Sequence, residues 1–115
     1  DLAALADPVA LEQIVHNLLA NAQHALAQVP AAERALAVAA REDSGRVVLT
    51  LRDSGPGIAP EMLPRLFEPF FSTREGGLGL GLPLSESLAL GMGGSLTVAN
   101  APPRGALLRL ELPRA

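Results

Sequence analysis

The sequence feature that most restricts the possible folds of this chain is a set of four β-type segments. They form two neighbouring pairs, and helical segments precede each pair. Residues 35–41 and 46–53 are rich in Val, Leu and Ala and flank the turn sequence EDSG, while residues 95–100 and 106–113 flank APPRG. Each pair is typical of two strands joined by a short connection. The order predicts an α+β fold, a two-layer α/β sandwich whose mixed, mainly antiparallel sheet is covered on one face by about three helices.

The helical segments have recognisable ends. Asp7 and Pro8 predict the start of a helix, because Asp caps helices and Pro fits their first turn. Apolar side chains then recur at helical spacing over residues 9–29, and Pro30 ends the pattern. Residues 83–92 predict a second long helix, which the glycine pair after it ends.

The composition excludes several classes of protein. A chain of 115 residues with 49% apolar residues suits one ordered domain, so we expect residues 1–115 to form a single unit. There is no cysteine for a disulfide or a thiolate metal site. No apolar run approaches the ~20 residues that span a bilayer, and a net charge of −3 argues against broad nucleic-acid binding. Because the sequence opens with Asp1 and not Met, we expect a fragment of a longer protein.

A polar stripe runs along the first predicted helix. At ~100° per residue, the side chains that share it are Gln13, Asn17, Asn21, His24 and Gln28. Asn is a mediocre helix former, so two of them one turn apart need a reason. The stripe is either a solvated face or a row of carboxamide oxygens able to hold a hydrated cation such as Mg²⁺.

Residues 76–83, GGLGLGLP, have three interpretations: a hinge, a strand or a loop around phosphate. A strand is the weakest, because four glycines would leave one face empty. A Walker A loop fails, because Leu82 and Pro83 stand where Lys and Ser or Thr are required. The dinucleotide fingerprint also fails, because its third glycine and its downstream acidic residue are missing. A glycine-rich turn into a helix that starts near Pro83 still favours an anion.

The sequence DSGPG at residues 53–57 also has two interpretations. It is an ordinary Asx or Pro-Gly turn, or Asp53 accepts a hydrogen bond from the amine of a bound ring. In the second case, Gly55 and Gly57 would let a flat ring approach the backbone.

Four segments in this order resemble the N, G1, F and G2 boxes of the catalytic ATP-binding domain of sensor histidine kinases, within the Bergerat-fold ATPase group. They are QIVHNLLANAQHAL, DSGPGI, LFEPFFSTR and GLGLGLPLSESLALGMGGSL. The resemblance runs from about residue 7 to residue 113. It implies the Bergerat fold with a mobile ATP lid, Mg-ATP as the bound nucleotide, and transfer of the γ-phosphate to a histidine on a separate dimerisation domain.

The resemblance also implies roles for single residues. Asn21 would be the main Mg²⁺ ligand with Asn17 assisting, Asp53 would bind the adenine amino group, and Arg74 would reach the γ-phosphate from the lid. His24 would lie near the phosphates. The ordinary alternative for His24 and for Arg74 is an exposed side chain with no such role. Asn17, Asn21 and Arg74 are the expected catalytic residues. The residues expected to contact the nucleotide are Asn17, Asn21, His24, Asp53, Gly55, Gly57, Ile58, Phe67, Thr73, Arg74, Gly77, Leu78, Gly79, Leu80, Gly81 and Leu82.

All three aromatic side chains, Phe67, Phe70 and Phe71, fall in one short window that follows a predicted short helix at residues 60–67. By themselves they indicate a local apolar anchor. By the resemblance, they form the base of the lid and contact the neighbouring helical domain. The two interpretations are compatible.

One position separates kinases from hydrolases within the group. Hydrolytic members carry a Glu one turn before the metal-binding Asn, whereas this chain has Asn17, which cannot act as a general base. Glu12 projects away from the polar stripe. The alternatives that remain are a hydrolytic ATPase of the gyrase, mismatch-repair or chaperone type, an anti-sigma-type serine kinase, and a degenerate binding module. Asn17 and the F box argue against the hydrolase, the F box against the anti-sigma kinase, and the intact glycine boxes against degeneration.

The resemblance also implies partners outside these residues. Neither His16 nor His24 lies in the context of a phosphoacceptor, so the acceptor is expected on a dimerisation domain. A response regulator would receive the phosphate next, and the longer protein would be a homodimer. We expect a cytoplasmic location, in a protein that is itself soluble or anchored in the inner membrane. No nucleic-acid partner and no direct membrane contact by these residues are expected.

Overall fold

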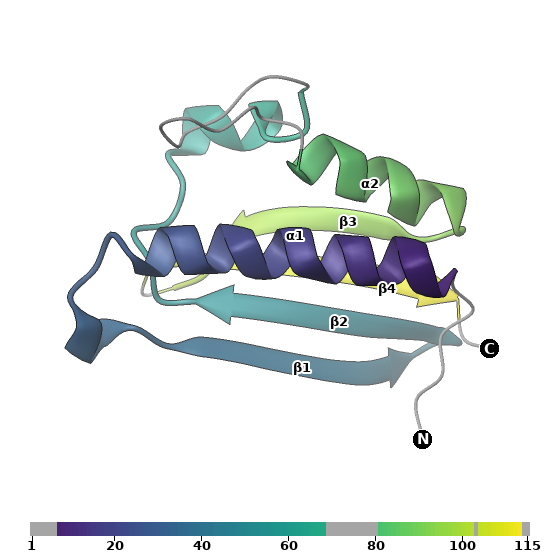
Figure 1. The fold of residues 1–115 in the computed structure, drawn as a ribbon, viewed down its shortest axis with the longest axis horizontal. Coiled ribbons are helices and arrows are strands. Elements are labelled where there is room, and N and C mark those ends of the chain that lie inside the picture. The colour runs from purple at the N-terminus through teal and green to yellow at the C-terminus, as the bar shows by residue number, and fades with distance from the viewer. Residues whose placement is uncertain (1–6, 69–80, 103, 114–115) are drawn as a thin grey trace.

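The computed structural model of this chain describes residues 7–68, 81–102 and 104–113. Its two long helices lie side by side over one face of a single sheet, which gives two layers (Figure 1). The elements follow the chain in the order α1 (Pro8–Leu26), η1 (Ala31–Glu33), β1 (Leu36–Asp43), β2 (Arg46–Asp53), η2 (Pro60–Arg65), α2 (Gly81–Gly91), β3 (Ser95–Asn100) and β4 (Ala106–Pro113).

The sheet has the strand order β1-β2-β4-β3, and all three pairings among these strands are antiparallel. β2 and β4 therefore occupy the centre, and β1 and β3 form the edges. In the register, Leu108 of β4 lies opposite Leu51 of β2 on one side and opposite Val98 of β3 on the other. This architecture confirms the prediction of an α+β, two-layer fold with a mainly antiparallel sheet.

The turn between β1 and β2 is tighter than the sequence predicts. Glu42 and Asp43 belong to β1, so only Ser44 and Gly45 connect the strands. Their φ angles are 53° and 80°. A two-residue hairpin loop favours positive φ at both positions, because that geometry matches the twist of the strands, and glycine adopts it without strain.

The core is aliphatic, as the shortage of aromatic residues predicts. α1 places Ile14, Leu18 and Ala22 against the sheet, and these residues share one helical face at a spacing of four. β4 alternates buried and half-buried residues along its whole length, as a strand with one covered face does. The main core cluster consists of Ile14, Leu18, Leu51, Ala89, Leu96, Leu108, Leu110 and Leu112.

Both long helices differ from their predicted ends. α1 stops at Leu26 rather than continuing to Val29. Gln28 and Val29 donate to residues three positions back, as in a tightened last turn, and Val29 is disfavoured in helical backbone because it precedes Pro30. α2 starts at Gly81, two residues before Pro83. The N–H groups of the first turn have no partner within a helix, so a proline at the third position removes no hydrogen bond. The short helix at residues 60–67 is a 3₁₀ helix over Pro60–Arg65.

β1 lies outside the cover of the helices. All eight of its residues are exposed, including Val38 at 56%, and Figure 1 shows the strand at the open edge of the sheet. Within the part of the chain that the structure describes, no helix is long and apolar enough to cross a bilayer.

Candidate functional site

Two asparagines of the polar stripe lie against the rest of the protein. The Asn17 side-chain nitrogen donates a hydrogen bond to Ser85 Oγ in α2 at 3.1 Å, and Ser85 is fully buried. Asn17 and Asn21 are half-buried, whereas Gln13 and Gln28 are exposed. The solvated-face interpretation therefore holds for the two glutamines and not for Asn17.

Asn21 has an unsatisfied polar atom. Its side-chain nitrogen is buried and has no hydrogen-bond partner among the described residues. A buried donor without an acceptor costs about 1–3 kcal/mol. Such a cost is removed when a ligand brings an acceptor such as a phosphate oxygen. The Asn21 side-chain nitrogen is therefore a hydrogen-bond donor that is available to a ligand.

Asn17 and Asn21 would offer a metal ion two carboxamide oxygens rather than a full set of protein ligands. Across the described residues, there is no group of three or more His, Cys, Asp and Glu side chains that could hold a metal ion. The Asn17 nitrogen makes the bond to Ser85, and the carboxamide oxygen is the atom of this side chain with the chemistry of a metal ligand. Mg²⁺ takes oxygen ligands, keeps several waters and is commonly shared with phosphates. Carboxamide oxygens such as those of Asn17 and Asn21 are of the ligand type that Mg²⁺ takes.

Ser85 was not predicted as a functional residue. It occupies the buried phase of α2, four residues before the buried Ala89. The available signal was a hydroxyl in an otherwise apolar stripe, which a buried position tolerates only with a hydrogen-bond partner. The identity of that partner could not be foreseen, because Asn17 is 68 residues away in sequence.

Asp53 ends β2 as a buried carboxylate with 4% of its surface exposed. Its Oδ1 accepts hydrogen bonds from the backbone N–H of Gly55 at 2.8 Å and of Ala106 at 3.3 Å. The first bond is an Asx turn, so the ordinary interpretation is correct. Both of these donors bind the same oxygen, which leaves Oδ2 as the oxygen suited to a ligand's amine.

The glycines of the Asp53 loop are required by their neighbours. A Cβ on Gly55 would lie 2.9 Å from Ala25 Cβ at the end of α1, closer than carbon atoms approach. Gly57 has a φ of +79°, where L side chains are strained. The loop therefore packs directly against α1, and this contact brings Asp53 to the helix that carries Asn17 and Asn21.

A second loop, between β3 and β4, completes this end of the site. Gly105 has a φ of +99°, and a Cβ there would overlap the carbonyl oxygen of Asp53. Asn100 bonds both backbone groups of Ile58. Sequence reasoning missed Asn100, Gly105 and Ala106, although Gly105 could have been suspected from its place in the APPRG turn.

The other predicted residues have the following positions. His24 is half-buried in the last turn of α1. Phe67 and Leu82 are half-buried and pack on the core, Ile58 is half-buried, and Gly81 begins α2. The predictions for Phe70, Phe71, Thr73, Arg74, Gly77, Leu78, Gly79 and Leu80, and hence for the lid, lie outside the described residues.

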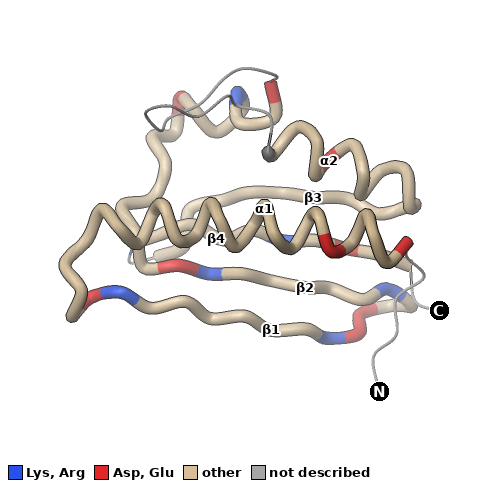
Figure 2. The backbone as a smooth tube through the Cα atoms, in the orientation of Figure 1, with Lys and Arg blue, Asp and Glu red and all other residues tan. Residues whose placement is uncertain are grey.

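Charge is sparse around the described site. α1 contains one acidic residue, Glu12, and no Lys or Arg, and Figure 2 shows most charged residues on strands and connections. The N-terminus of α2 carries N–H groups that have no acceptor within the helix and lies at the positive end of the helix dipole, and both features favour an anion.

Comparison with known proteins shows the family to which this arrangement of residues belongs. Residues 6–115 match the family described as histidine kinase-, DNA gyrase B- and HSP90-like ATPases. The chain is 40% identical over 109 residues to the sensor histidine kinase ZraS of Klebsiella oxytoca, covering 94% of this chain and 23% of that protein. It is 50% identical over 111 residues to the two-component sensor PprA of Pseudomonas aeruginosa, covering 91% and 12%. It thus spans less than a quarter of the length of either relative.

Solved structures agree with these relatives. The mycobacterial sensor histidine kinase MprB has a TM-score of 0.80 at 34% identity, and the match covers 94% of this chain and 72% of that one. Full-length ShkA in complex with AMPPNP has a TM-score of 0.84 at 34% identity, covering 100% and 24%. These matches confirm the resemblance that the four sequence boxes suggested.

Proposed function

Since this chain belongs to the family of histidine kinase-, DNA gyrase B- and HSP90-like ATPases, we propose that it binds Mg-ATP and donates the γ-phosphate to a histidine on a separate dimerisation domain. Its relatives are sensor histidine kinases, which supports a kinase catalytic domain. The observation that carries the proposal is the buried Asp53 carboxylate, which is held through one oxygen beside a helix with two inward amides.

Asp53, Gly55, Gly57 and Ile58 form what we call the base half of the site. The exocyclic amine of adenine would donate to Asp53 Oδ2, because Oδ1 already accepts two N–H groups. A carboxylate that receives a hydrogen bond in a buried place binds more strongly than a neutral acceptor. Guanine presents a carbonyl at the same ring position, which a carboxylate repels, so this arrangement favours adenine.

Asn17, Asn21, Ser85 and the start of α2 at Gly81 form the phosphate half. The oxygens of Asn17 and Asn21 would hold Mg²⁺, whose role when bound is to neutralise charge on the phosphates. Ser85 orients Asn17, and the buried Asn21 nitrogen would find an acceptor on the ligand. Arg74 would add positive charge at the γ-phosphate.

Transfer to a protein side chain is favoured over hydrolysis by the residue at position 17. Asn17 cannot remove a proton from water, and its amide nitrogen is already bonded to Ser85. The imidazole of an incoming histidine needs no such base, because its neutral nitrogen carries a lone pair. The acceptor domain, a downstream response regulator, a homodimeric longer protein and a cytoplasmic location all follow from this proposal.

The test is a transfer assay. The 115-residue chain is mixed with radiolabelled Mg-ATP and the histidine-bearing dimerisation domain of the same protein, with Asn21→Ala and the exposed-site variant Gln13→Ala in parallel. We expect acid-labile, base-stable label on the dimerisation domain with the wild type and Gln13→Ala, and not with Asn21→Ala. Brisk phosphate release to water, with no label on the domain, would contradict the proposal and favour a hydrolase.

A further inference from the structure

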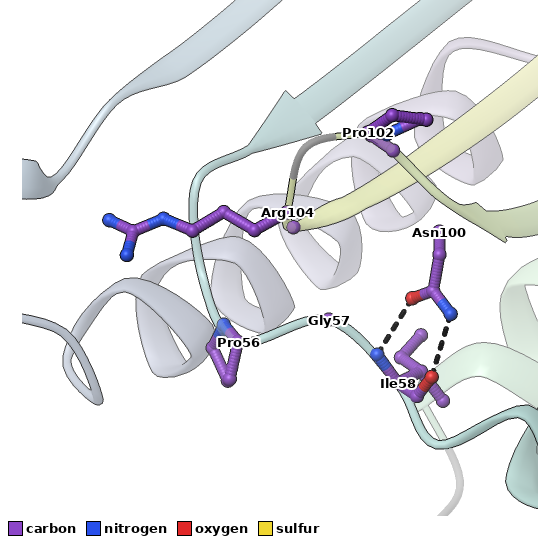
Figure 3. A pocket seen from close by; sticks show the side chains of 8 residues that line it. Pro56, Gly57, Ile58, Asn100, Pro102 and Arg104 are labelled. Carbon is purple, nitrogen blue, oxygen red and sulfur yellow. Dashed lines mark hydrogen bonds between the residues drawn. The ribbon is translucent and has the colours of Figure 1, made fainter.

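The loop that carries Gly57 and Ile58 is backed by a hollow. A pocket of about 390 Å³ lies between residues 56–58 and the β3–β4 connection at residues 100–102, 104 and 105. Figure 3 shows the two segments facing each other across it. The two segments are thus not packed closely together along their whole length, and hydrogen bonds between them help to hold the loop.

Asn100 spans this hollow with two hydrogen bonds. Its Oδ1 accepts from the Ile58 N–H at 2.7 Å, and its Nδ2 donates to the Ile58 carbonyl oxygen at 2.7 Å (Figure 3). One side chain thus satisfies both backbone groups of a residue 42 positions away. A bidentate contact of this kind fixes both position and orientation.

The contact also reaches the neighbouring glycine. A Cβ added to Gly57 would lie 3.1 Å from Asn100 Oδ1, so the amide lies close against the Gly57 backbone. At the other end of the same connection, Ala106 donates to Asp53 Oδ1. The β3–β4 segment therefore holds the base half at two points, Asp53 and Ile58.

We propose that Asn100 is a positioning residue for the base half: it braces Ile58 and Gly57 so that the loop after Asp53 keeps its shape around adenine. This inference rests on the proposed function. Asn100 touches the loop and not the nucleotide, so its effect on ATP is transmitted through Ile58 and Gly57. Both bonds are solvent-exposed, so their loss has a moderate effect.

The test compares Asn100→Ala with Asn100→Asp and with Thr97→Ala, an exposed position on the same strand. The aspartate variant has nearly the same shape, keeps the acceptor for the Ile58 N–H and loses the donor to the Ile58 carbonyl. In calorimetric titrations with Mg-ATP, we expect affinity to fall about fivefold to tenfold for both Asn100 variants and to stay unchanged for Thr97→Ala.

Amide hydrogen exchange supplies a second readout that does not depend on nucleotide. We expect the Ile58 amide to exchange faster in both Asn100 variants, while the buried Leu110 amide keeps its wild-type rate. Wild-type affinity in a folded Asn100 variant, or exchange that rises equally at Ile58 and Leu110, would overturn the inference. If Asn100→Ala fails to fold, Asn100→Asp decides by the same criteria. If the wild type itself does not bind ATP, the proposed function fails, and exchange at Ile58 still tests the brace.

Discussion

Around Asp53 the protein has already made its hydrogen bonds, whereas along α1 the Asn21 amide is buried with no partner among the described residues. The base half is held by backbone N–H groups, by Asn100 and by the close approach of Gly105. In the phosphate half, Asn17 is held by its bond to Ser85, whereas the neighbouring Asn21 nitrogen has no such bond among the described residues.

This difference follows from the chemistry of the two ends of ATP. Adenine is neutral and flat, so a preformed site for it costs the free protein little. A triphosphate is highly charged and arrives with its metal ion, so its ligands must keep unsatisfied polar atoms in the free chain. We therefore expect substitutions in the base half to change both stability and binding, and substitution of the unsatisfied Asn21 in the phosphate half to change binding alone.

The largest effect is expected from Gly105→Ala. The added methyl would overlap the Asp53 carbonyl, and a φ of +99° is unfavourable for alanine. We expect the free energy of unfolding to fall by about 3 kcal/mol or more, measured by chemical denaturation. Gly45→Ala is the matched control, since its φ is +80° with no atom within 4 Å. It should cost only about 1–2 kcal/mol, and equal losses at the two positions would contradict the close packing at Asp53.

Asp53→Asn should weaken Mg-ATP binding about 100-fold or more, which is about 2.7 kcal/mol. The amide keeps an oxygen for the Gly55 N–H but cannot offer a carboxylate to the adenine amine. Calorimetric titration measures the change, and Asp43→Asn, an exposed carboxylate of β1, is the control. Unchanged affinity in Asp53→Asn would remove Asp53 from the site.

Asn21→Ala is expected to separate function from stability. It removes the oxygen that we propose as a Mg²⁺ ligand, so Mg-ATP affinity should fall about thirtyfold. It also removes a buried donor without a partner, so the melting temperature of the free chain should stay the same or rise. Circular dichroism without nucleotide checks this, beside Gln13→Ala. A marked drop in melting temperature would mean that the Asn21 amide is satisfied in the free protein.

Ser85→Ala is expected to have the smallest effect. Without the hydroxyl, the Asn17 nitrogen loses the acceptor at 3.1 Å, so its carboxamide is held less firmly. Affinity for Mg-ATP should fall about fivefold and stability by about 1 kcal/mol, whereas the exposed Ser87→Ala should change neither. Wild-type Mg-ATP affinity in Ser85→Ala would mean that Ser85 does not position Asn17.

Local patterns predicted the elements well where their ends are marked in the sequence. The strands at residues 95–100 and 106–113 have the bounds that the sequence predicts, because alternation and flanking turn residues define both ends. α1 was drawn too long at its C-terminus and α2 too short at its N-terminus. In both cases the prediction placed the end of the helix at a proline. Pro30 also disfavours helical backbone at the residue before it, whereas Pro83 is tolerated in the first turn of α2.

The supporting residues of the site could not be predicted in the same way. Asn100, Ala106 and Ser85 act on partners 42, 53 and 68 positions away. Such contacts depend on strand order and on the packing of α1 against α2. Neither of these can be recognised from a regular spacing of residues in the sequence. The roles of Asn17, Asn21 and Asp53 came from a family resemblance and remain predictions, which the variants above test.

Titration of the wild-type 115-residue chain with ATP, with and without Mg²⁺, tests the division into two halves most directly. We expect measurable binding with Mg²⁺ and weaker but detectable binding in EDTA, because the base half is complete without the metal. Asp53→Asn should lose both signals, and Asn21→Ala should lose only the gain that Mg²⁺ brings. No binding in Mg²⁺, or binding that Asp53→Asn leaves intact, would contradict this division.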